Sequence, residues 1–344
     1  MKTLLRLLLK SQHQQNRSRP TKTEKGMTLV ELLVGAIMAF LIITPMLAFV
    51  VDMLNTDRRE QVKANTDQDI QAAVDFIAQD LSQAIYIYDQ AGITAINPET
   101  KLPPAPANTK GTPILVFWKR QQIKNAVPIN NSIKPNQCAI TANADKCNDT
   151  YVLSLVAYYQ IIDTTPNPIW CQPSGGTCPT RIARYEIREP VRNPYTVDAT
   201  KPYYDAADVS DAQKGSAAFN QGFNFNKPTV DVTTGANFPP PEVLVNYIDH
   251  SITNVPIPTG AQCQTLLSVT PPAPATFDAN DLLIKNDPTY SFYACVDTSK
   301  NIARVTIRGN SLRRLQADAP YNPKSPAFFP TATVQVQGLG GLGK

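Results

Sequence analysis

Glu31 carries the only formal charge in the 25-residue run from Met27 to Val51, which is otherwise largely apolar. A carboxylate at membrane depth costs on the order of 3 kcal/mol even on a lenient insertion scale, so it requires a partner. Thr28 and Glu31 match the S/T-x-x-E capping box, in which the glutamate bonds back to the threonine amide. Alternatively, a cation from another chain neutralises the carboxylate.

Cysteine is the second residue type with chemistry of its own, and all six cysteines follow the apolar run. An even number in proline-rich, turn-rich sequence indicates disulfides and an oxidising compartment. Zinc fails on spacing, because no two cysteines have the two-to-four-residue gap of a metal knuckle. Free buried cysteines remain an alternative. Six cysteines allow fifteen pairings. The first choice is sequential: Cys138 with Cys147, Cys171 with Cys178, and Cys263 with Cys295.

No set of residues matches an established catalytic arrangement, so we do not expect an enzyme. His250, beside Asp249 at the end of a predicted strand, is interpreted as a solvated or satisfied loop histidine. Asp278, Asn280 and Asp281 lack the glycine and terminal glutamate of an EF-hand loop, so they do not favour calcium. The sequence also has no P-loop and no dinucleotide fingerprint. We therefore expect no metal and no cofactor.

Charge is distributed unevenly along the 344 residues, of which 42% are hydrophobic. Residues 1–26 hold seven of the 32 basic residues and one of the 28 acidic residues, so the rest of the chain is slightly acidic. The basic character therefore belongs to the N-terminal segment alone. This distribution excludes a broad phosphate-binding surface, and no nucleic acid partner is expected.

Residues 27–51 are predicted to form a transmembrane helix, because at ~1.5 Å per residue they exceed the ~30 Å hydrocarbon core. The basic residues 1–26 precede this helix, so the positive-inside rule places the N-terminus in the cytoplasm and the remainder outside. A cleaved signal peptide is disfavoured, because the run is too long and no small-x-small site follows it. The prediction is a single-pass protein in contact with membrane lipid.

Residues 52–92 are predicted to extend the helix as an amphipathic segment. Apolar residues recur at three- and four-residue steps on one side, and polar residues occupy the other. We expect the apolar side to pack against a sheet, and we expect Pro45 to kink the preceding helix. The apolar side comprises Ile70, Ala73, Val74, Ile77, Leu81, Ala84, Ile85 and Tyr88.

Residues 93–344 are predicted to form an extracytoplasmic, disulfide-containing β-rich domain with large proline-rich loops. Between Pro190 and Pro241 periodicity is weak, which indicates either a disordered excursion or a surface for partners. Its aromatic residues could stack on sugar rings, but packing onto their own domain is the preferred interpretation; they are Tyr203, Tyr204, Phe219, Phe223 and Phe225. The candidate strands are residues 113–119, 151–162, 181–189, 242–249, 290–296, 301–308 and 331–337.

The segment Gly26-Met-Thr-Leu-Val-Glu31, after a basic leader and before about twenty apolar residues, resembles the processing signal of type IV prepilins and type II secretion pseudopilins. The resemblance implies that a prepilin peptidase cuts between Gly26 and Met27 and that the new N-terminus is methylated. It also implies that Glu31 pairs with the Met27 amine of a neighbouring subunit. Two features depart from the family: Met27 stands where Phe is more common, and the 26-residue leader is long.

The same resemblance implies an α+β, pilin-like fold in which a long N-terminal helix packs on an antiparallel sheet. Implied partners are the prepilin peptidase, other pilins or pseudopilins, and an inner-membrane assembly platform. The protein would reside in the inner membrane with a periplasmic body, and on a fibre or the cell surface after assembly. Val74–Ala84 resembles the minor pilin and pseudopilin branch that primes fibres.

Among that branch, the whole chain most resembles the pseudopilins linked to hormogonium polysaccharide secretion in filamentous cyanobacteria. The predicted function is therefore a minor subunit of a fibre used for secretion or motility. The alternative is a membrane- or fibre-displayed adhesin or carbohydrate-binding module that uses the same signal. A tethered envelope hydrolase is disfavoured because no catalytic arrangement was found.

Overall fold

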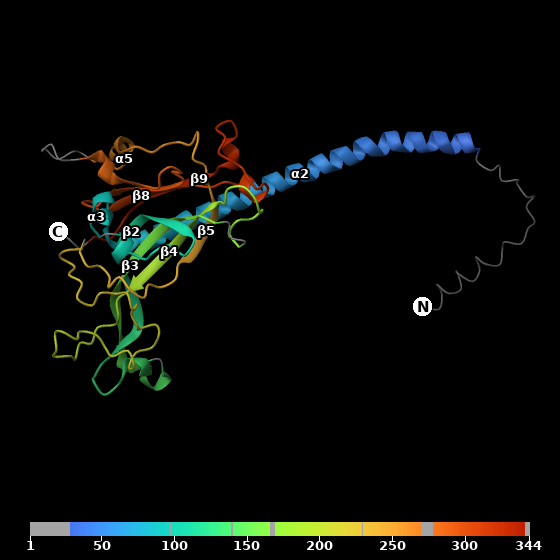
Figure 1. The fold of residues 1–344 in the computed structure, drawn as a ribbon. Helices are drawn as coiled ribbons and strands as arrows, with labels where there is room; N and C mark the ends of the chain where they lie inside the picture. The colour runs from blue at the N-terminus through green and yellow to red at the C-terminus, as the bar shows by residue number, and fades with distance from the viewer. Residues whose placement is uncertain are drawn as a thin grey trace, which may run out of the picture. The chain divides into compact units, whose positions relative to one another are not determined.

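The computed structural model describes residues 28–96, 98–138, 140–165, 169–228, 230–269 and 278–340 (Figure 1). Gly26 and Met27, the residues of the predicted processing site, lie outside these ranges. The chain divides into two compact units, residues 1–57 and residues 58–344. A single helix of 54 residues, α2 (Leu29–Ser82), contributes to both units.

In the first unit, α2 exposes apolar side chains around its whole circumference. From Leu29 to Leu54 the large apolar side chains are between 48% and 84% exposed. A kink at Pro45 was predicted from the sequence. In the structure, Pro45 lies inside one uninterrupted helix, Leu29–Ser82. Among the described residues, α2 is the one helix long and apolar enough to cross a membrane, which is compatible with single-pass anchoring.

In the second unit, α2 buries one side and ends earlier than expected. Its buried apolar residues are Ile70, Ala73, Val74, Ile77 and Leu81, all from the predicted stripe. The prediction that the helix reaches residue 92 is wrong, because it ends at Ser82 and Ala84–Ile87 forms strand β1. These residues are rich in β-branched and aromatic types and find a pairing partner in the sheet, so strand pairing overrides the helical period.

The first sheet contains five antiparallel strands in the order β1-β2-β3-β4-β5. β2 is much longer than the predicted strand at residues 113–119, because it pairs along nearly its whole length with β3. After β1 the strands are β2 (Thr109–Pro128), β3 (Cys147–Asp163), β4 (Thr180–Arg188) and β5 (Glu242–Ile248).

The second sheet contains four antiparallel strands in the order β6-β7-β8-β9. They are β6 (Leu283–Lys285), β7 (Phe292–Asp297), β8 (Ile302–Arg308) and β9 (Thr331–Gln337). β6 has only three residues, too few for a recognisable alternation, and was not predicted. The short helices are α3 (Gln90–Ile96), α4 (Pro98–Lys101), α5 (Gly260–Leu266), η1 (Pro135–Gln137), η2 (Thr141–Lys146), η3 (Ala279–Leu282), η4 (Leu312–Arg314) and η5 (Pro326–Phe328).

One core joins the buried side of α2 to both sheets, which gives the second unit its α+β architecture. Ile70 and Ile77 of α2 share this core with Phe117 of β2 and Val305 of β8. Gly309, which follows β8, permits the close approach of the helix. A Cβ atom at this position would lie 2.1 Å from Ile70 Cδ1 and 2.9 Å from Thr66 Cγ2.

The loop between β4 and β5 packs on its own domain through aromatic residues. The Trp118 ring of β2 stacks on Phe223 at a centroid distance of 4.8 Å and meets Phe225 edge-on at 5.5 Å. Phe219 also meets the Trp118 ring edge-on, at a centroid distance of 6.3 Å. Because Phe219 and Phe223 are buried in these contacts, their faces are not offered to a ligand.

Candidate functional site

The start of α2 shows how Thr28 and Glu31 are arranged. The Glu31 amide donates to Thr28 Oγ1 at 3.3 Å and to the Thr28 carbonyl at 3.0 Å. Thr28 thus caps the first turn of the helix. Over the described ranges no ion pair includes the Glu31 carboxylate. The cap that begins the helix is therefore formed by the threonine oxygen and does not depend on the glutamate side chain.

The apolar half of α2 that follows Glu31 needs an apolar environment. Phe40 and Phe49 are each 70% exposed, and the large apolar residues between and around them are similarly uncovered. Such a surface far exceeds the small apolar patches of soluble monomers, and it marks a lipid or protein contact. Glu31 stands at the edge of this surface, three residues after the capping threonine.

Three disulfides stabilise the loops of the body. The bonds join Cys138 to Cys147, Cys171 to Cys178 and Cys263 to Cys295, with Cα separations of 5.8, 4.9 and 5.3 Å. These are the pairs of the sequential arrangement. The first closes the turn between β2 and β3, the second closes the turn before β4, and the third fastens α5 to β7.

A buried arginine supports the second disulfide, and sequence reasoning missed it. Arg313 is fully buried after β8. Its guanidinium donates to the carbonyls of Thr177, Pro173 and Gln316 at 2.9, 3.0 and 3.1 Å. These bonds tie the Cys171–Cys178 turn to the end of the second sheet. A single arginine in the three-residue helix η4 has no periodic signal, so only the tertiary structure reveals its role.

A buried group of charges fastens α2 to the first sheet. Asp80 of α2 accepts from Lys119 Nζ of β2 at 3.0 Å, Tyr158 Oη of β3 at 2.7 Å and Arg184 Nε of β4 at 2.7 Å. Arg184 Nη2 also donates to Glu186 at 2.6 Å, and Lys119 lies 3.4 Å from the same carboxylate. Two acids and two bases thus compensate one another where the helix crosses three strands.

The environment of Asp80 keeps its carboxyl group ionised. Burial alone would raise the pKa, but hydrogen bonds from Arg184 and Tyr158 and the charge of Lys119 hold it below its ordinary value. Burial also raises the pKa of Tyr158, so the phenol remains a donor. The sequence does contain a signal for this group: Asp80 lies three residues after Ile77 and so falls on the same side of the helix as the buried apolar residues. The sequence interpretation did not use it.

His250 differs from the solvated alternative of the sequence interpretation, because it is 7% exposed. Its Nε2 atom lies 3.7 Å from Asp318 Oδ1, while Nδ1 is buried and has no hydrogen-bond partner among the described residues. Burial lowers the pKa of His250, and the nearby Arg313 charge acts in the same direction against the raising effect of Asp249. The imidazole is therefore held in its neutral form.

Asp278 has a structural task in the segment considered for calcium. Its Oδ1 atom accepts from the Asn280 amide at 2.8 Å and caps the short helix η3. Over the part of the chain that the structure describes, no group of three or more His, Cys, Asp or Glu residues has the geometry of a metal site.

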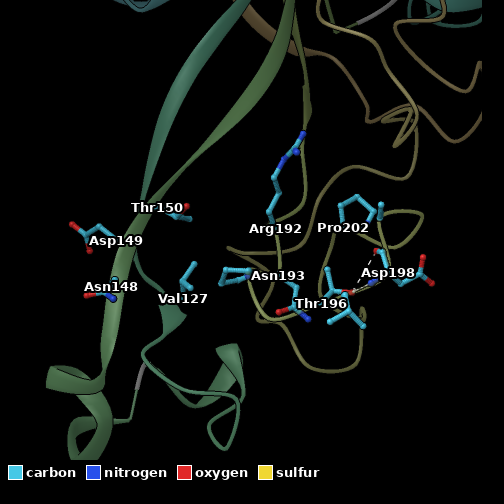
Figure 2. Close-up of a pocket in the computed structure, with 12 residues that line it drawn as sticks. Val127, Asn148, Asp149, Thr150, Arg192, Asn193, Thr196, Asp198 and Pro202 are labelled. Atoms are coloured by element: carbon cyan, nitrogen blue, oxygen red, sulfur yellow. Dashed lines mark hydrogen bonds between the residues drawn. The ribbon is translucent and has the colours of Figure 1, made fainter.

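An open cleft of about 540 Å³ lies between the paired ends of β2 and β3 and the loop of residues 192–202 (Figure 2). Val127 and Thr150 belong to the strand side, and Asn193 and Pro202 to the loop side. Three charged residues line it: both Asp149 oxygens accept protein hydrogen bonds, Arg192 pairs with Glu189 at 2.8 Å, and Asp198 Oδ1 accepts from the amide and the hydroxyl of Thr200. The remaining lining consists of neutral amides, hydroxyls and small apolar groups.

Comparison with known proteins gives no match: no family model fits the sequence, and no curated protein or solved structure is significantly similar to the chain.

Proposed function

We propose that this chain is a non-enzymatic minor pilin or pseudopilin, anchored by α2 and cut after Gly26, that primes or joins a fibre for secretion or motility. The proposal extends to polysaccharide as the secreted material. One observation carries it: a glycine and a glutamate bracket the start of a long apolar helix whose surface is uncovered. An ordinary membrane anchor requires neither of these two residues at that place.

The geometry at Thr28 supports a role for Glu31 outside its own chain. Because Thr28 Oγ1 already caps the Glu31 amide, helix initiation does not need the carboxylate. A free ammonium at Met27 and the Glu31 carboxylate are each costly in hydrocarbon, and they neutralise one another when neighbouring subunits meet. This gives assembly an electrostatic driving force that a lone subunit cannot satisfy.

The body supports a low-copy subunit. It carries three disulfides, two sheets and a loop of some fifty residues between β4 and β5. A bulk subunit that repeats along a fibre gains from a compact, uniform body, whereas a subunit used once can present large loops.

The decisive experiment measures the mature N-terminus and the effect of Glu31→Gln. The mass of the N-terminal peptide isolated from membranes should show that the mature chain begins at Met27. In the Gly26→Val variant, the full-length precursor should remain uncut. Glu31→Gln should permit processing but sharply reduce incorporation into fibres. Glu60→Gln, an exposed glutamate of α2 beyond the apolar run, is the matched control and should assemble normally. A mature chain that starts at Met1 would refute the proposal.

A displayed binding module is the second candidate, and the cleft of Figure 2 favours it. Apart from Asp149, Arg192 and Asp198, its lining consists of neutral amides, hydroxyls and apolar groups, which suits a polar ligand such as a saccharide. If display is the function, Glu31→Gln should leave surface exposure and ligand binding unchanged. The double variant Asn193→Ala with Thr196→Ala, which shortens two polar side chains on the loop side of the cleft, should then lower ligand binding without altering fibres.

A further inference from the structure

A second cavity, of about 390 Å³, lies within the connection between β4 and β5. Two segments line it, residues 201–209 and residues 214–221, together with Pro190 just after β4. Among the described residues, none lines both this cavity and the cleft of Figure 2, so the two are separate sites. Its size falls near the lower end of the roughly 300–1,000 Å³ of small-molecule sites.

The segment that carries Lys214 is fixed to the end of β4. Gly215 packs against Pro190, since a Cβ atom at this glycine would lie 2.4 Å from Pro190 Cδ. Arg188 Nη2 donates to the Lys214 carbonyl at 2.5 Å, and the Ser216 amide donates to the Arg188 carbonyl at 2.8 Å. The backbone of this wall is therefore held in place by the protein itself.

The segment that carries Lys201 is fixed to the same part of the chain. Tyr203 Oη donates to Glu189 Oε1 at 3.0 Å, and the Tyr204 amide donates to the Val191 carbonyl at 3.4 Å. Both walls are thus attached to the residues around the end of β4. A ligand that enters the cavity need not order these walls, which removes one of the usual costs of binding.

Each wall contributes one lysine whose charge has no partner in the protein. Over the described part of the chain, no acidic group pairs with Lys201 or Lys214. Asp205 is the one acid of the lining, and its carboxylate has neither a cation nor a hydrogen-bond donor among the described residues. Two lysines against one aspartate give the lining a net charge of +1. Cations that line a concave surface without a partner attract an anion.

The neutral part of the lining narrows the kind of anion. Pro190, Ala206 and Val209 offer apolar surface, and Gln221 offers a side-chain amide without a partner in the described ranges. Inorganic phosphate uses neither feature, and Asp205 repels its higher charge. A sugar acid uses all of them: its carboxylate pairs with the lysines, its hydroxyls bond to the amide and to Asp205, and its C–H groups contact the apolar side chains.

We infer that this cavity binds an acidic saccharide, a chain of uronic acid units. The inference rests on the proposed function and deepens it, because it gives the secreted polysaccharide a chemical class. An extended peptide fits less well, since its backbone N–H and C=O groups require partners that the apolar side chains do not supply. A neutral saccharide leaves both lysines without an acceptor.

The first test measures binding to the full chain in detergent by isothermal titration calorimetry at low ionic strength. The probes are trisaccharides of galacturonic, glucuronic and mannuronic acid, with maltotriose as the uncharged counterpart. At least one acidic trisaccharide should bind about tenfold more tightly than maltotriose, and added salt should weaken it. The inference is overturned if none of the three binds or if maltotriose binds as tightly.

The second test locates the binding with matched variants. Lys201→Gln with Lys214→Gln should lower the affinity about tenfold for each lysine, because each change removes a charge-assisted hydrogen bond. Lys201→Arg with Lys214→Arg keeps both charges and should retain binding. Lys146→Gln with Lys324→Gln, two exposed lysines outside the cavity, is the control for net charge and should bind like the parent chain. Equal affinities of the two glutamine variants overturn the inference.

Because Lys201 and Lys214 are exposed, their variants should keep the near-UV circular dichroism spectrum of the parent chain. If the double glutamine variant fails to fold, each single variant is compared with Lys146→Gln instead. Inorganic phosphate and a hexaglutamate peptide serve as competitors. Displacement of the bound trisaccharide by either competitor at equal concentration shows a general anion site and overturns the assignment to a saccharide.

Failure of this inference and failure of the proposed function give different results. If Glu31→Gln blocks incorporation into fibres and no acidic trisaccharide binds, the chain is a fibre subunit and the cavity is not a saccharide site. If an acidic trisaccharide binds through the two lysines but Glu31→Gln assembles normally, the saccharide site stands and the fibre role fails.

Discussion

Lys119 Nζ of β2 lies 3.0 Å from Asp80 Oδ1 of α2, with both side chains almost completely buried. Arg184 approaches the other carboxylate oxygen at 2.7 Å, so one aspartate holds the helix to two strands through two cations. Removing one member of such a buried group leaves the others uncompensated, which is far more costly than losing an exposed pair.

We expect Asp80→Asn to lower the free energy of unfolding by about 3–5 kcal/mol, because the two buried cations Lys119 and Arg184 would then share Glu186 as their one carboxylate in this group. Asp75→Asn, on the exposed side of the same helix, is the control and should change it by less than about 0.5 kcal/mol. Urea unfolding of the full chain in detergent, followed by near-UV circular dichroism, measures both. Equal stability of the two variants would show that the charges are replaceable.

The buried, neutral His250 predicts a loss of stability on mild acidification. Its pKa is lowered in the folded state, so the unfolded chain binds a proton more readily below the ordinary value of 6.5. The free energy of unfolding should therefore fall as pH decreases from about 6.5 toward the folded pKa, and then show no further dependence on this group. The melting temperature measured between pH 7 and pH 4.5 should show the decline.

His250→Gln should flatten this part of the pH profile, because glutamine does not titrate. The other histidine, His13, belongs to the segment that the proposed cleavage removes, so the processed chain carries His250 as its one histidine. An unaltered slope in the His250 variant would assign the decline to carboxylates instead.

Gly309 is expected to resist substitution because it lies against the helix. Gly309→Ala should destabilise the body by about 1–3 kcal/mol, the usual cost of overpacking, since Ile70 is fully buried and has little room to move. Ile70→Val removes the Cδ1 atom that the new methyl group would meet. The double variant should therefore be more stable than the sum of the two single changes, as measured by thermal unfolding.

Gly222→Ala provides the control for that series, because its nearest neighbour would lie 3.5 Å from the new atom. It should unfold within about 0.5 kcal/mol of the parent chain. Additive effects of Gly309→Ala and Ile70→Val would contradict the proposed contact.

The three disulfides predict both a thiol count and an order of stability losses. Labelling under denaturing, non-reducing conditions should find no free thiols in the native protein. Replacing Cys263 and Cys295 by alanine, which opens the widest sequence separation of 32 residues, should cost about 3–4 kcal/mol. Replacing Cys171 and Cys178, separated by seven residues, should cost about 2–3 kcal/mol. Six labelled thiols would contradict the oxidised state.

The sequence by itself determined the features that depend on neighbours along the chain. The uncharged run after Glu31, the threonine three residues before it and the stripe from Ile70 to Leu81 follow from local spacing and helical period. Most strands were placed by alternation or by flanking turns. Sequential cysteine pairing could be predicted because each pair encloses its own turn or connection.

The tertiary structure decided the features that depend on distant partners. The residues after Ser82 leave the helix because β2 offers them an edge, and their β-branched and aromatic side chains favour a strand only where such a partner exists. Asp80 becomes a buried counter-charge only where β2, β3 and β4 meet the helix. The register of β9 on β8 is likewise a relation between two segments that neither one contains.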